Sequence, residues 1–375
     1  MVRVDRATLT PAPPDERTAA WLGLALGVTF SVCFATGVWS HLAQDPPGWF
    51  SSPARPAGLY RVTQGLHVTT GTASIPLLLA KLWTVRARLV EWPPVRSALH
   101  GVERLALLPL VAGGLFLLLS GTANVAGWYP WGFFFPRAHF WAAWITIGAL
   151  VVHIGAKAGA TWAAVRRPAL PPDPAATAER RSFLGAAAAG AAALVVATAG
   201  GTVAPLARLS FLAPRDPHDG PQGLAVNKSA GAAGVEAAAL DEGYRLAVDG
   251  DVDRPLALSL ADLRDMPARE ATLPIACVEG WSASARWRGV PVRDLLERAG
   301  AHPGARVTVE SLQEGGRYRT SELAGAQLDD ADTLLALDLD GEPLHLDHGY
   351  PVRLIAPNRP GVLQTKWVGR LVVHQ

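Results

Sequence analysis

The stretch CVEGWSASARWRGVPVRDLLERAG, from Cys277 to Gly300, decides how this sequence is interpreted. It follows Thr272–Ala276, a short apolar run that predicts a β-strand. It ends in Val290–Ala299, whose apolar residues recur at helical spacing, and Gly300 is placed to close that helix. Cys277 is therefore expected in a loop between a strand and a helix.

The chain has only two cysteines, and they stand in unlike surroundings. Cys33 lies inside an apolar run, whereas Cys277 lies in the polar part of the chain, so the two are not expected to pair. If the polar part is exported, Cys277 is an unpaired thiol in an oxidising compartment. Such a thiol calls for a functional explanation.

The overall composition conceals two different halves. The chain has 375 residues, enough for two domains, and half of them are apolar while only 18% are charged. The first half holds apolar stretches, and the last third alternates short apolar runs with charges, Gly and Pro. The basic residues do not cluster as a nucleic-acid surface requires, and we expect no nucleic-acid partner.

Five segments of the first half are long and apolar enough to cross a bilayer. Basic residues concentrate in the N-terminal tail and in the second and fourth connections. The positive-inside rule then predicts a cytoplasmic N-terminus and an extracytoplasmic location for everything after about Pro205. The five segments are Ala19–His41, Thr63–Trp83, Val102–Thr122, His139–Ala160 and Ser182–Ala204.

These segments define the expected domain organisation of a multidomain membrane protein. An all-α transmembrane bundle of four helices and a fifth linking helix precedes an α+β domain. The expected parts are a cytoplasmic tail (1–18), a four-helix transmembrane domain (19–160), a cytoplasmic loop (161–181), the fifth transmembrane helix (182–204), a linker with an Asn-containing loop (205–240) and a catalytic domain (241–375).

The fifth helix opens with Arg180-Arg181-Ser182-Phe183-Leu184 and continues as an Ala- and Gly-rich run. This resembles the twin-arginine (Tat) export signal, which implies the Tat machinery as a partner and a domain that folds around its cofactor before export. The alternative is two ordinary arginines that obey the positive-inside rule.

Histidines in the predicted membrane segments favour a haem. His139 and His153 are 14 residues apart, so they share one helix face about 21 Å apart along the axis. The helix count and histidine placement resemble b561-like membrane cytochromes. Lys81 stands where a second inner ligand would be needed, so one b haem near the outer face is expected. His67 and His139 are the first choice of iron ligands, with His41 and His153 as alternatives; interfacial histidines can also simply cap helix ends.

The last third predicts a mixed α+β domain. Short helices are expected at Ser259–Asp265 and Val290–Ala299. Further strands are expected at Tyr244–Val248, Ala305–Ser311, Thr333–Leu339, Val352–Ala356 and Leu371–His374.

The run that begins at Cys277 strongly resembles the metal-binding segment of the sulfite oxidase superfamily of molybdopterin-dependent oxidoreductases. In that family a Cys precedes a Gly-Trp or similar pair, then Trp-x-Gly-Val/Phe-Pro and a helix. The resemblance implies that the Cys277 thiolate binds molybdenum, for which it is a suitable soft ligand. The alternative is a cysteine that acts as a small core hydrophobe.

A second block carries the same resemblance, since Asp340-Gly-Glu-Pro-Leu344, Asp347-His-Gly-Tyr-Pro-Val-Arg353 and Lys366-Trp367 follow the family's order of features. It implies that the molybdopterin phosphate and pterin are bound by His348, Arg353 and Lys366, groups that suit an anion. Asn227 is implied as a weaker cofactor contact and Tyr318 as the tyrosine beside the metal. Taken singly, each basic residue could also be a surface charge.

The departures from the family bear on the substrate. The sequence has Val226-Asn227-Lys228 where sulfite oxidases have an Arg-Asn-His type of sequence, and it ends at Gln375 without their dimerisation domain. The layout is closer to the bacterial periplasmic protein-methionine-sulfoxide reductase catalytic subunit, which works with a separate haem-bearing membrane partner. This chain looks like both parts fused.

The expected function is oxygen-atom transfer at an extracytoplasmic molybdenum centre that exchanges electrons with the membrane pool, through a b haem. Expected partners are a small-molecule or methionine-sulfoxide-type substrate, membrane lipid, and the quinone pool or a redox partner. Reduction of sulfoxides or N-oxides is favoured over oxidation. Alternatives are sulfite oxidation, a haem-free anchored reductase served by a separate electron donor, and a cofactor-free scaffold.

Overall fold

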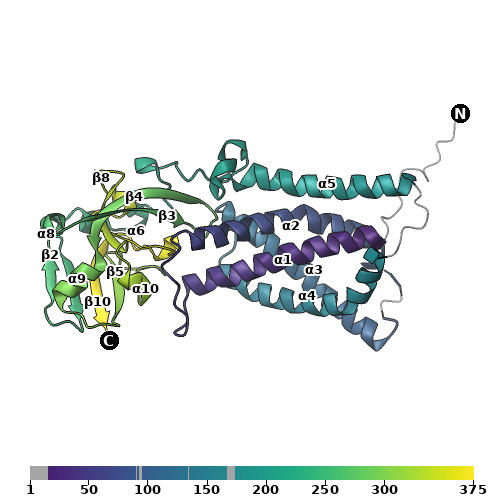
Figure 1. The fold of residues 1–375 in the computed structure, drawn as a ribbon, viewed down its shortest axis with the longest axis horizontal. Coiled ribbons are helices and arrows are strands. Elements are labelled where there is room, and N and C mark those ends of the chain that lie inside the picture. The colour runs from purple at the N-terminus through teal and green to yellow at the C-terminus, as the bar shows by residue number, and fades with distance from the viewer. Residues whose placement is uncertain (1–15, 90, 93–94, 134, 167–173) are drawn as a thin grey trace. The chain divides into compact units, whose positions relative to one another are not determined.

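The computed structural model describes residues 16–375 except 90, 93–94, 134 and 167–173 (Figure 1). The chain forms two compact units. The helical unit extends to Ala35 and includes His67–Asn124 and Trp128–Ala197. The sheet unit combines Thr36–Leu66, Val125–Gly127 and Thr198–Gln375, so it takes in the end of the first helix and the start of the second.

Five long helices lie in the first half, and each predicted segment overlaps one of them. Four are long and apolar enough to cross a membrane, and α2 is not among these four. The prediction of five spans differs here because α2 carries many Thr residues together with Gln64, His67 and Lys81. The helices are α1 Glu16–Gln44, α2 Leu59–Leu89, α3 Ala98–Val125, α4 Phe135–Arg166 and α5 Pro174–Thr198.

The last of these helices ends before the predicted limit of Ser182–Ala204. Regular α-helix stops at Thr198, and a 3-10 turn over Ala199–Gly201 follows. Gly200 lies so close to Ser210 and Ala207 that a side chain would not fit, because a Cβ there would approach the Ser210 Cβ to 2.5 Å. The chain therefore turns tightly as it enters the sheet unit.

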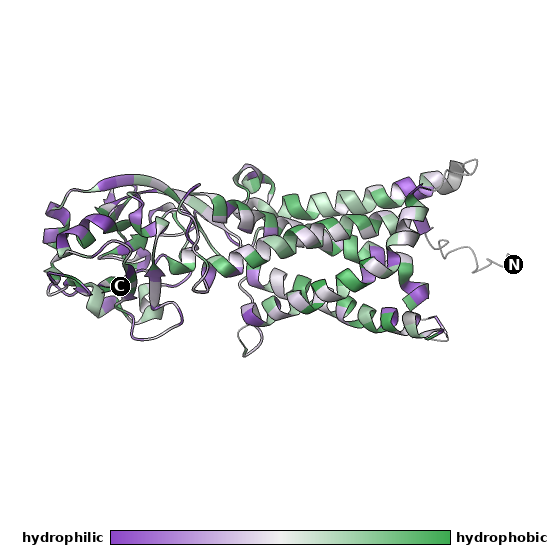
Figure 2. Ribbon diagram, turned by 60° about the horizontal axis from the view of Figure 1, so that its bottom comes forward, coloured by the Kyte–Doolittle hydropathy of each residue, from purple (hydrophilic) through white to green (hydrophobic). Residues whose placement is uncertain are grey.

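Small and apolar side chains hold the helical unit together. Leu22 of α1 and Leu77 of α2 pack against Ala187 and Ala191 of α5. Many large apolar side chains of the helices are exposed, Leu105 and Leu108 among them, and the middle of the helices is strongly hydrophobic (Figure 2). An exterior of this kind exceeds what soluble proteins usually expose and fits a lipid environment.

The sheet unit is built on two five-stranded sheets in the described part of the chain. One has the order β2-β1-β10-β5-β6; the other runs β3-β4-β7-β8, and β9 also pairs with β7. The strands are β1 Leu246–Gly250, β2 Leu256–Leu258, β3 Arg269–Ala276, β4 Ser282–Pro291, β5 Arg306–Ser311, β6 Thr320–Leu323, β7 Leu334–Leu339, β8 Glu342–Pro343, β9 Arg353–Ile355 and β10 Val368–His374.

The predicted strands of the last third are all present, together with four that the sequence analysis did not anticipate: β2, β4, β6 and β8. The predicted helix over Val290–Ala299 starts later, as α9 Val292–Ala299, because Val290 and Pro291 end β4. Gly300 closes it in the left-handed conformation, as expected. The other predicted helix is α8 Leu260–Asp265, which opens with a capping box of Ser259 and Asp262.

The stretch 205–240, expected to be a linker with an Asn-containing loop, lies among short helical turns, some of which have buried residues. Ala230, Val235 and Ala239 pack with Trp367, and Leu224 joins the core around Cys277. These turns are η3 Ala204–Leu209, η4 Pro221–Gly223, α6 Ala230–Ala233 and α7 Glu236–Ala239.

Candidate functional site

Cys277 directly follows β3, in a tight turn. The Cys277 amide donates to the Trp281 carbonyl at 2.9 Å, and the Gly280 amide donates to the Cys277 carbonyl at 3.1 Å. Gly280 has φ of +90°, a conformation that favours glycine. The turn leaves the Cys277 side chain buried, with 3% exposure.

The Cys277 sulfur is surrounded by hydrogen-bond donors. Asn227 Nδ2 lies 2.7 Å from Sγ, and the Glu279 amide nitrogen lies 3.5 Å from it. Trp281 Nε1 donates to Asn227 Oδ1 at 3.1 Å, which orients the amide. Burial, helped by the Glu279 charge, raises the pKa of the free thiol to about 12. A metal that binds here must therefore displace the thiol proton. The resulting thiolate would already accept hydrogen bonds from these donors.

Arg215 completes this loop. Its guanidinium donates to Asn227 Oδ1 at 2.7 Å and to Glu279 Oε2 at 3.0 Å. The positive charge beside the Cys277 turn is thus matched by a carboxylate. Sequence reasoning missed Arg215 because it precedes both motif blocks of the C-terminal domain.

Three basic side chains gather in the second motif block. His348 ends the 3-10 turn η5 Leu346–His348, Arg353 begins β9, and Lys366 precedes β10. Lys366 Nζ donates to the carbonyls of Lys228 and Asp347 at 2.9 and 2.7 Å. Burial, with the charge of Arg353, nevertheless lowers the pKa of Lys366 to about 7.

His348 is neutral in this environment. Burial, together with the charges of Arg353 and Lys366, lowers its pKa to about 4. Its Nε2 lies 2.6 Å from the Pro221 carbonyl, so Nε2 carries the proton and Nδ1 is a bare acceptor. His348 Nδ1 has no hydrogen-bond partner among the described residues. A buried acceptor of this kind suits a ligand N–H group.

Arg353 and Arg359 are both buried arginines of this region, yet only one is satisfied. Arg359 donates to the Leu363 carbonyl, the Gln327 side chain and the Glu322 carbonyl at 3.0, 2.7 and 2.7 Å. Arg353 donates to the His348 carbonyl at 3.1 Å, and its Nε has no partner within the described part of the chain. Since buried charges are normally paired, Arg353 is in the state of a group that binds an anion.

Tyr318 is half-buried in the loop before β6. Burial raises its pKa. Tyr60 of α2, which the sequence analysis did not single out, is buried and packs against Ala276, the residue before Cys277. Asn227 contacts the Cys277 sulfur directly, and Tyr60 packs beside the same turn.

The described residues contain no group of three or more His, Cys, Asp or Glu side chains placed to hold a metal. A metal at Cys277 would need its other ligands from a cofactor. The buried thiol, the unsatisfied Arg353 and the neutral His348 fit a molybdopterin, which offers metal, phosphate and pterin N–H groups.

The two histidines predicted to bind haem lie together in the helical unit. The rings of His67 and His139 are 6.3 Å apart between centroids, with an angle of 67° between their planes. His67 Nδ1 lies 2.8 Å from the Cys33 carbonyl, and His139 Nδ1 lies 2.8 Å from Ser120 Oγ. Each ring is thus anchored through Nδ1, which leaves Nε2 for other bonds.

The alternative ligands do not form such a pair. His153 Nδ1 is buried without a partner in the described residues, and Lys81 donates to the Ala19 carbonyl at 2.6 Å. His41 belongs to the part of α1 that packs in the sheet unit.

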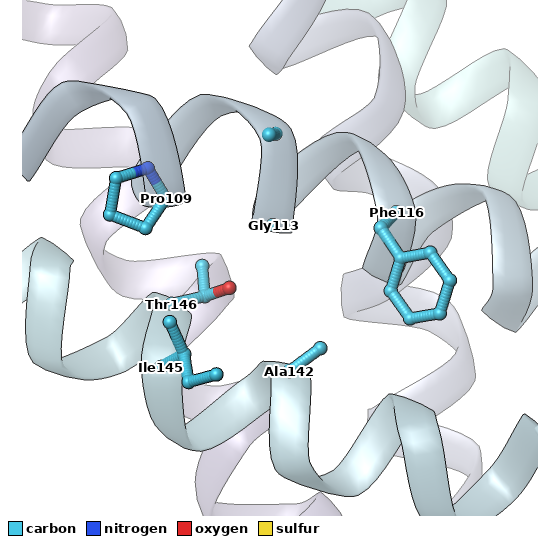
Figure 3. Close-up of a pocket in the computed structure, with 7 residues that line it drawn as sticks. Pro109, Gly113, Phe116, Ala142, Ile145 and Thr146 are labelled. Atoms are coloured by element: carbon cyan, nitrogen blue, oxygen red, sulfur yellow. The ribbon is translucent and has the colours of Figure 1, made fainter.

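An apolar cavity of about 240 Å³ lies between α3 and α4 (Figure 3). Pro109, Gly113 and Phe116 line it from α3, and Ala142, Ile145 and Thr146 line it from α4. Gly113 allows the helices to approach, because a Cβ there would lie 2.1 Å from Thr146 Oγ1. The lining has no charged group, so the cavity is a feature of helix packing.

Residues 233–375 match the family model of the oxidoreductase molybdopterin binding domain. This part of the chain is a molybdopterin-binding oxidoreductase domain. It includes Cys277, Tyr318, His348, Arg353 and Lys366, whereas Asn227 precedes the matched range.

Curated relatives agree with this assignment and support the sulfite oxidase superfamily. Mitochondrial sulfite oxidase of Homo sapiens is 34% identical over 158 residues, which cover 35% of this chain and 29% of that protein. An inducible nitrate reductase (NADH) of Glycine max is 33% identical over 162 residues, with 35% and 18% covered. The chain therefore spans less than a third of the length of these relatives.

Among solved structures, the sulfane dehydrogenase SoxCD from Paracoccus pantotrophus is 28% identical. The similarity covers 36% of this chain and 40% of that chain, with a TM-score of 0.33.

Proposed function

We propose that this protein is a membrane-bound molybdenum oxidoreductase that transfers an oxygen atom on the extracytoplasmic side. The proposal rests on one observation: the domain contains two sites that both lack a partner group. The Cys277 sulfur is buried among donors, and Arg353 is buried with an unsatisfied Nε. One molybdopterin would complete both.

Each residue of the candidate site has a role in this proposal. Cys277 holds the metal, and Asn227 and the Glu279 amide stabilise the thiolate by donating to sulfur. Arg353 and the remaining N–H of Lys366 hold the phosphate, while His348 accepts from the pterin. The bound cofactor supplies two-electron oxygen-atom transfer, and the protein orients it and excludes water.

Reduction of a sulfoxide or N-oxide fits the site better than oxidation of sulfite. A neutral substrate takes up two electrons and two protons, and releases a sulfide or amine and water. Arg215, beside the Cys277 turn, is already paired with Glu279. Lys228 Nζ, on the loop beside Asn227, donates to the Gln313 side chain at 2.5 Å. A dianion such as sulfite would therefore find the charge of Arg215 compensated and the Lys228 ammonium already hydrogen-bonded to an amide.

We infer that a b haem lies between His67 and His139 and passes electrons to or from the membrane pool. The ring centroids are 6.3 Å apart, close enough for both imidazoles to bind one iron, and a haem held there would supply single-electron transfer. Ligating histidines usually bond their second ring nitrogen to a carbonyl or hydroxyl, as both do here.

Four helices long and apolar enough to span support the proposed membrane setting. An extracytoplasmic domain also requires that α2 crosses as a fifth span, which the alternation of basic connections with a cytoplasmic N-terminus favours. Arg180-Arg181 before α5's apolar run support Tat export, so the domain would receive its cofactor before it crosses.

Metal and haem quantification of the purified full-length protein, combined with an activity panel, tests the proposal. We expect about one molybdenum per chain, a b-type Soret band, and reduction of sulfoxides or N-oxides that is lost in Cys277→Ala while the haem spectrum is kept. Full activity in Cys277→Ala would refute the site. Molybdenum without haem would favour the haem-free anchored reductase, and turnover of sulfite alone would reverse the proposed direction.

A further inference from the structure

The sheet unit includes a segment from the helices, Thr36–Leu66, that contains the end of α1 and the start of α2. Four polar side chains of this segment meet in one network: Ser40 and Gln44 come from α1, and Tyr60 and Gln64 from α2. Tyr60 has 1% exposure, and Ser40 and Gln64 are also buried. None of them belongs to a motif of the C-terminal domain.

The hydrogen bonds of this network have one consistent direction. The Ser40 hydroxyl donates to Gln64 Oε1 at 2.8 Å, which uses its single hydrogen. Ser40 Oγ then accepts from Gln44 Nε2 at 2.9 Å and from the Tyr60 hydroxyl at 3.2 Å. Because Oε1 is bound to Ser40, the other end of the Gln64 amide, Nε2, points away and donates to the Val278 carbonyl at 3.2 Å.

The network therefore reaches the backbone on both sides of Cys277. Gln64 bonds the residue after it, Val278, and Tyr60 packs with Ala43 against the residue before it, Ala276. Tyr60 is fully buried beside this turn, and burial raises its pKa.

Other contacts fix the segment to the same domain. The buried Asn358 accepts from the Tyr60 amide at 2.6 Å and donates to the Pro53 carbonyl at 2.6 Å. Arg55 forms ion pairs with Asp330 and Asp332. The segment that carries the network, Thr36–Leu66, is thus held to the rest of the sheet unit at several points.

A purely structural contact does not explain this arrangement. Apolar side chains would fill the same space without the cost of desolvating four polar groups. A fully satisfied buried network instead specifies one geometry of the groups it contacts. Here the contacted group is the turn that presents the Cys277 sulfur.

We propose that Ser40, Tyr60 and Gln64 form a positioning network from the helices that sets the orientation of the Cys277 turn toward the metal. The inference rests on the proposed function, because it takes Cys277 as the molybdenum ligand. These are positioning residues, since they act through the Ala276–Val278 backbone and touch neither substrate nor cofactor. The membrane-proximal segment would then be a required part of the molybdenum site.

Gln64→Leu tests the network in the full-length holoenzyme, because it removes the bond to Val278 and keeps the volume. We expect molybdenum content and haem spectrum close to wild type, a kcat lower by about 10–100-fold, a KM changed less than about twofold, and an altered Mo(V) electron paramagnetic resonance signal. Tyr60→Phe, which removes a single hydroxyl, should change the signal in the same direction but less. If the Gln64→Leu protein does not accumulate, Tyr60→Phe serves as the test.

Tyr244→Phe is the matched control. Tyr244 is also buried, and its hydroxyl also bonds a backbone carbonyl, that of Val368 at 2.6 Å, but in the core of the other sheet. It should leave kcat and the Mo(V) signal unchanged. A wild-type kcat and signal in a molybdenum-loaded Gln64→Leu protein would overturn the network, and so would an equal effect of Tyr244→Phe. Absence of molybdenum from the wild-type protein would instead overturn the proposed function.

Discussion

Replacement of Arg353 by Met should stabilise the apo-protein and weaken its hold on the cofactor. The two effects have opposite signs because Arg353 is a buried cation that the protein does not satisfy. Its exposure is 4%, and within the described residues its guanidinium makes one hydrogen bond, to the His348 carbonyl. A residue kept for stability would show the reverse behaviour.

The magnitudes follow from the burial of the guanidinium. Burial lowers the pKa of Arg353 well below its usual range, to about 9, which corresponds to a cost of about 5 kcal/mol for the charged form. Replacing a poorly compensated buried charge by an apolar side chain gains about 1–4 kcal/mol, or about 2–4 °C per kcal/mol in a domain of this size. Loss of a charge-assisted bond to phosphate costs about 1.5–3 kcal/mol, so cofactor affinity should fall about 10–150-fold.

The assay compares apo-protein from a cofactor-deficient host with protein from a replete host. Thermal unfolding of the apo form measures stability, and molybdenum per chain measures retention. Arg359→Met is the control, because Arg359 is equally buried but donates to three protein acceptors. Its loss should destabilise the apo-protein by about 3 kcal/mol or more. A destabilised apo form of Arg353→Met with unchanged molybdenum retention would refute the reasoning.

Three further changes test the other parts of the sites. Asn227→Leu removes a donor to the Cys277 sulfur, and molybdenum retention measured by metal analysis should fall about 10–100-fold. Ser120→Ala frees the His139 ring, and titration of the apo-protein with haem should show a similar loss of haem affinity, with molybdenum unchanged. The apo-protein should bind the cofactor more tightly as the pH falls through about 7. The lowered pKa of Lys366 leaves its amine neutral above that pH, and only the ammonium form attracts phosphate. A Lys366→Arg variant with the same pH dependence would contradict this.

Local patterns made part of the fold predictable. The strand before Cys277 and the helix closed by Gly300 depend on residues that are neighbours in sequence. Strand β4 was not anticipated, although its buried and exposed residues largely alternate. Its inward-facing residues include the small Ala283 and Ala285, so the period of two that is the usual signature of a strand is weak in the sequence.

The candidate site was predictable only where a family motif covers it. Cys277, His348, Arg353 and Lys366 belong to such motifs, but their electrostatic states do not appear in the sequence. The neutral His348 and the unsatisfied Arg353 result from burial by strands that are distant in the chain. Arg215 and its partner Glu279 are 64 residues apart and have no shared motif.

The positioning network shows which pattern could have revealed the missing part of the site. Ser40 and Gln44 are four residues apart on α1, and Tyr60 and Gln64 are four residues apart on α2, so each pair lies on one helix face. Ser40, Tyr60 and Gln64 are buried at these helix ends, where a polar group is costly unless another element satisfies it. Two such pairs on consecutive helices predict that the helices bond each other and that any remaining donor is directed at a third element. Here that donor is the Gln64 amide, and the third element is the turn that carries Cys277.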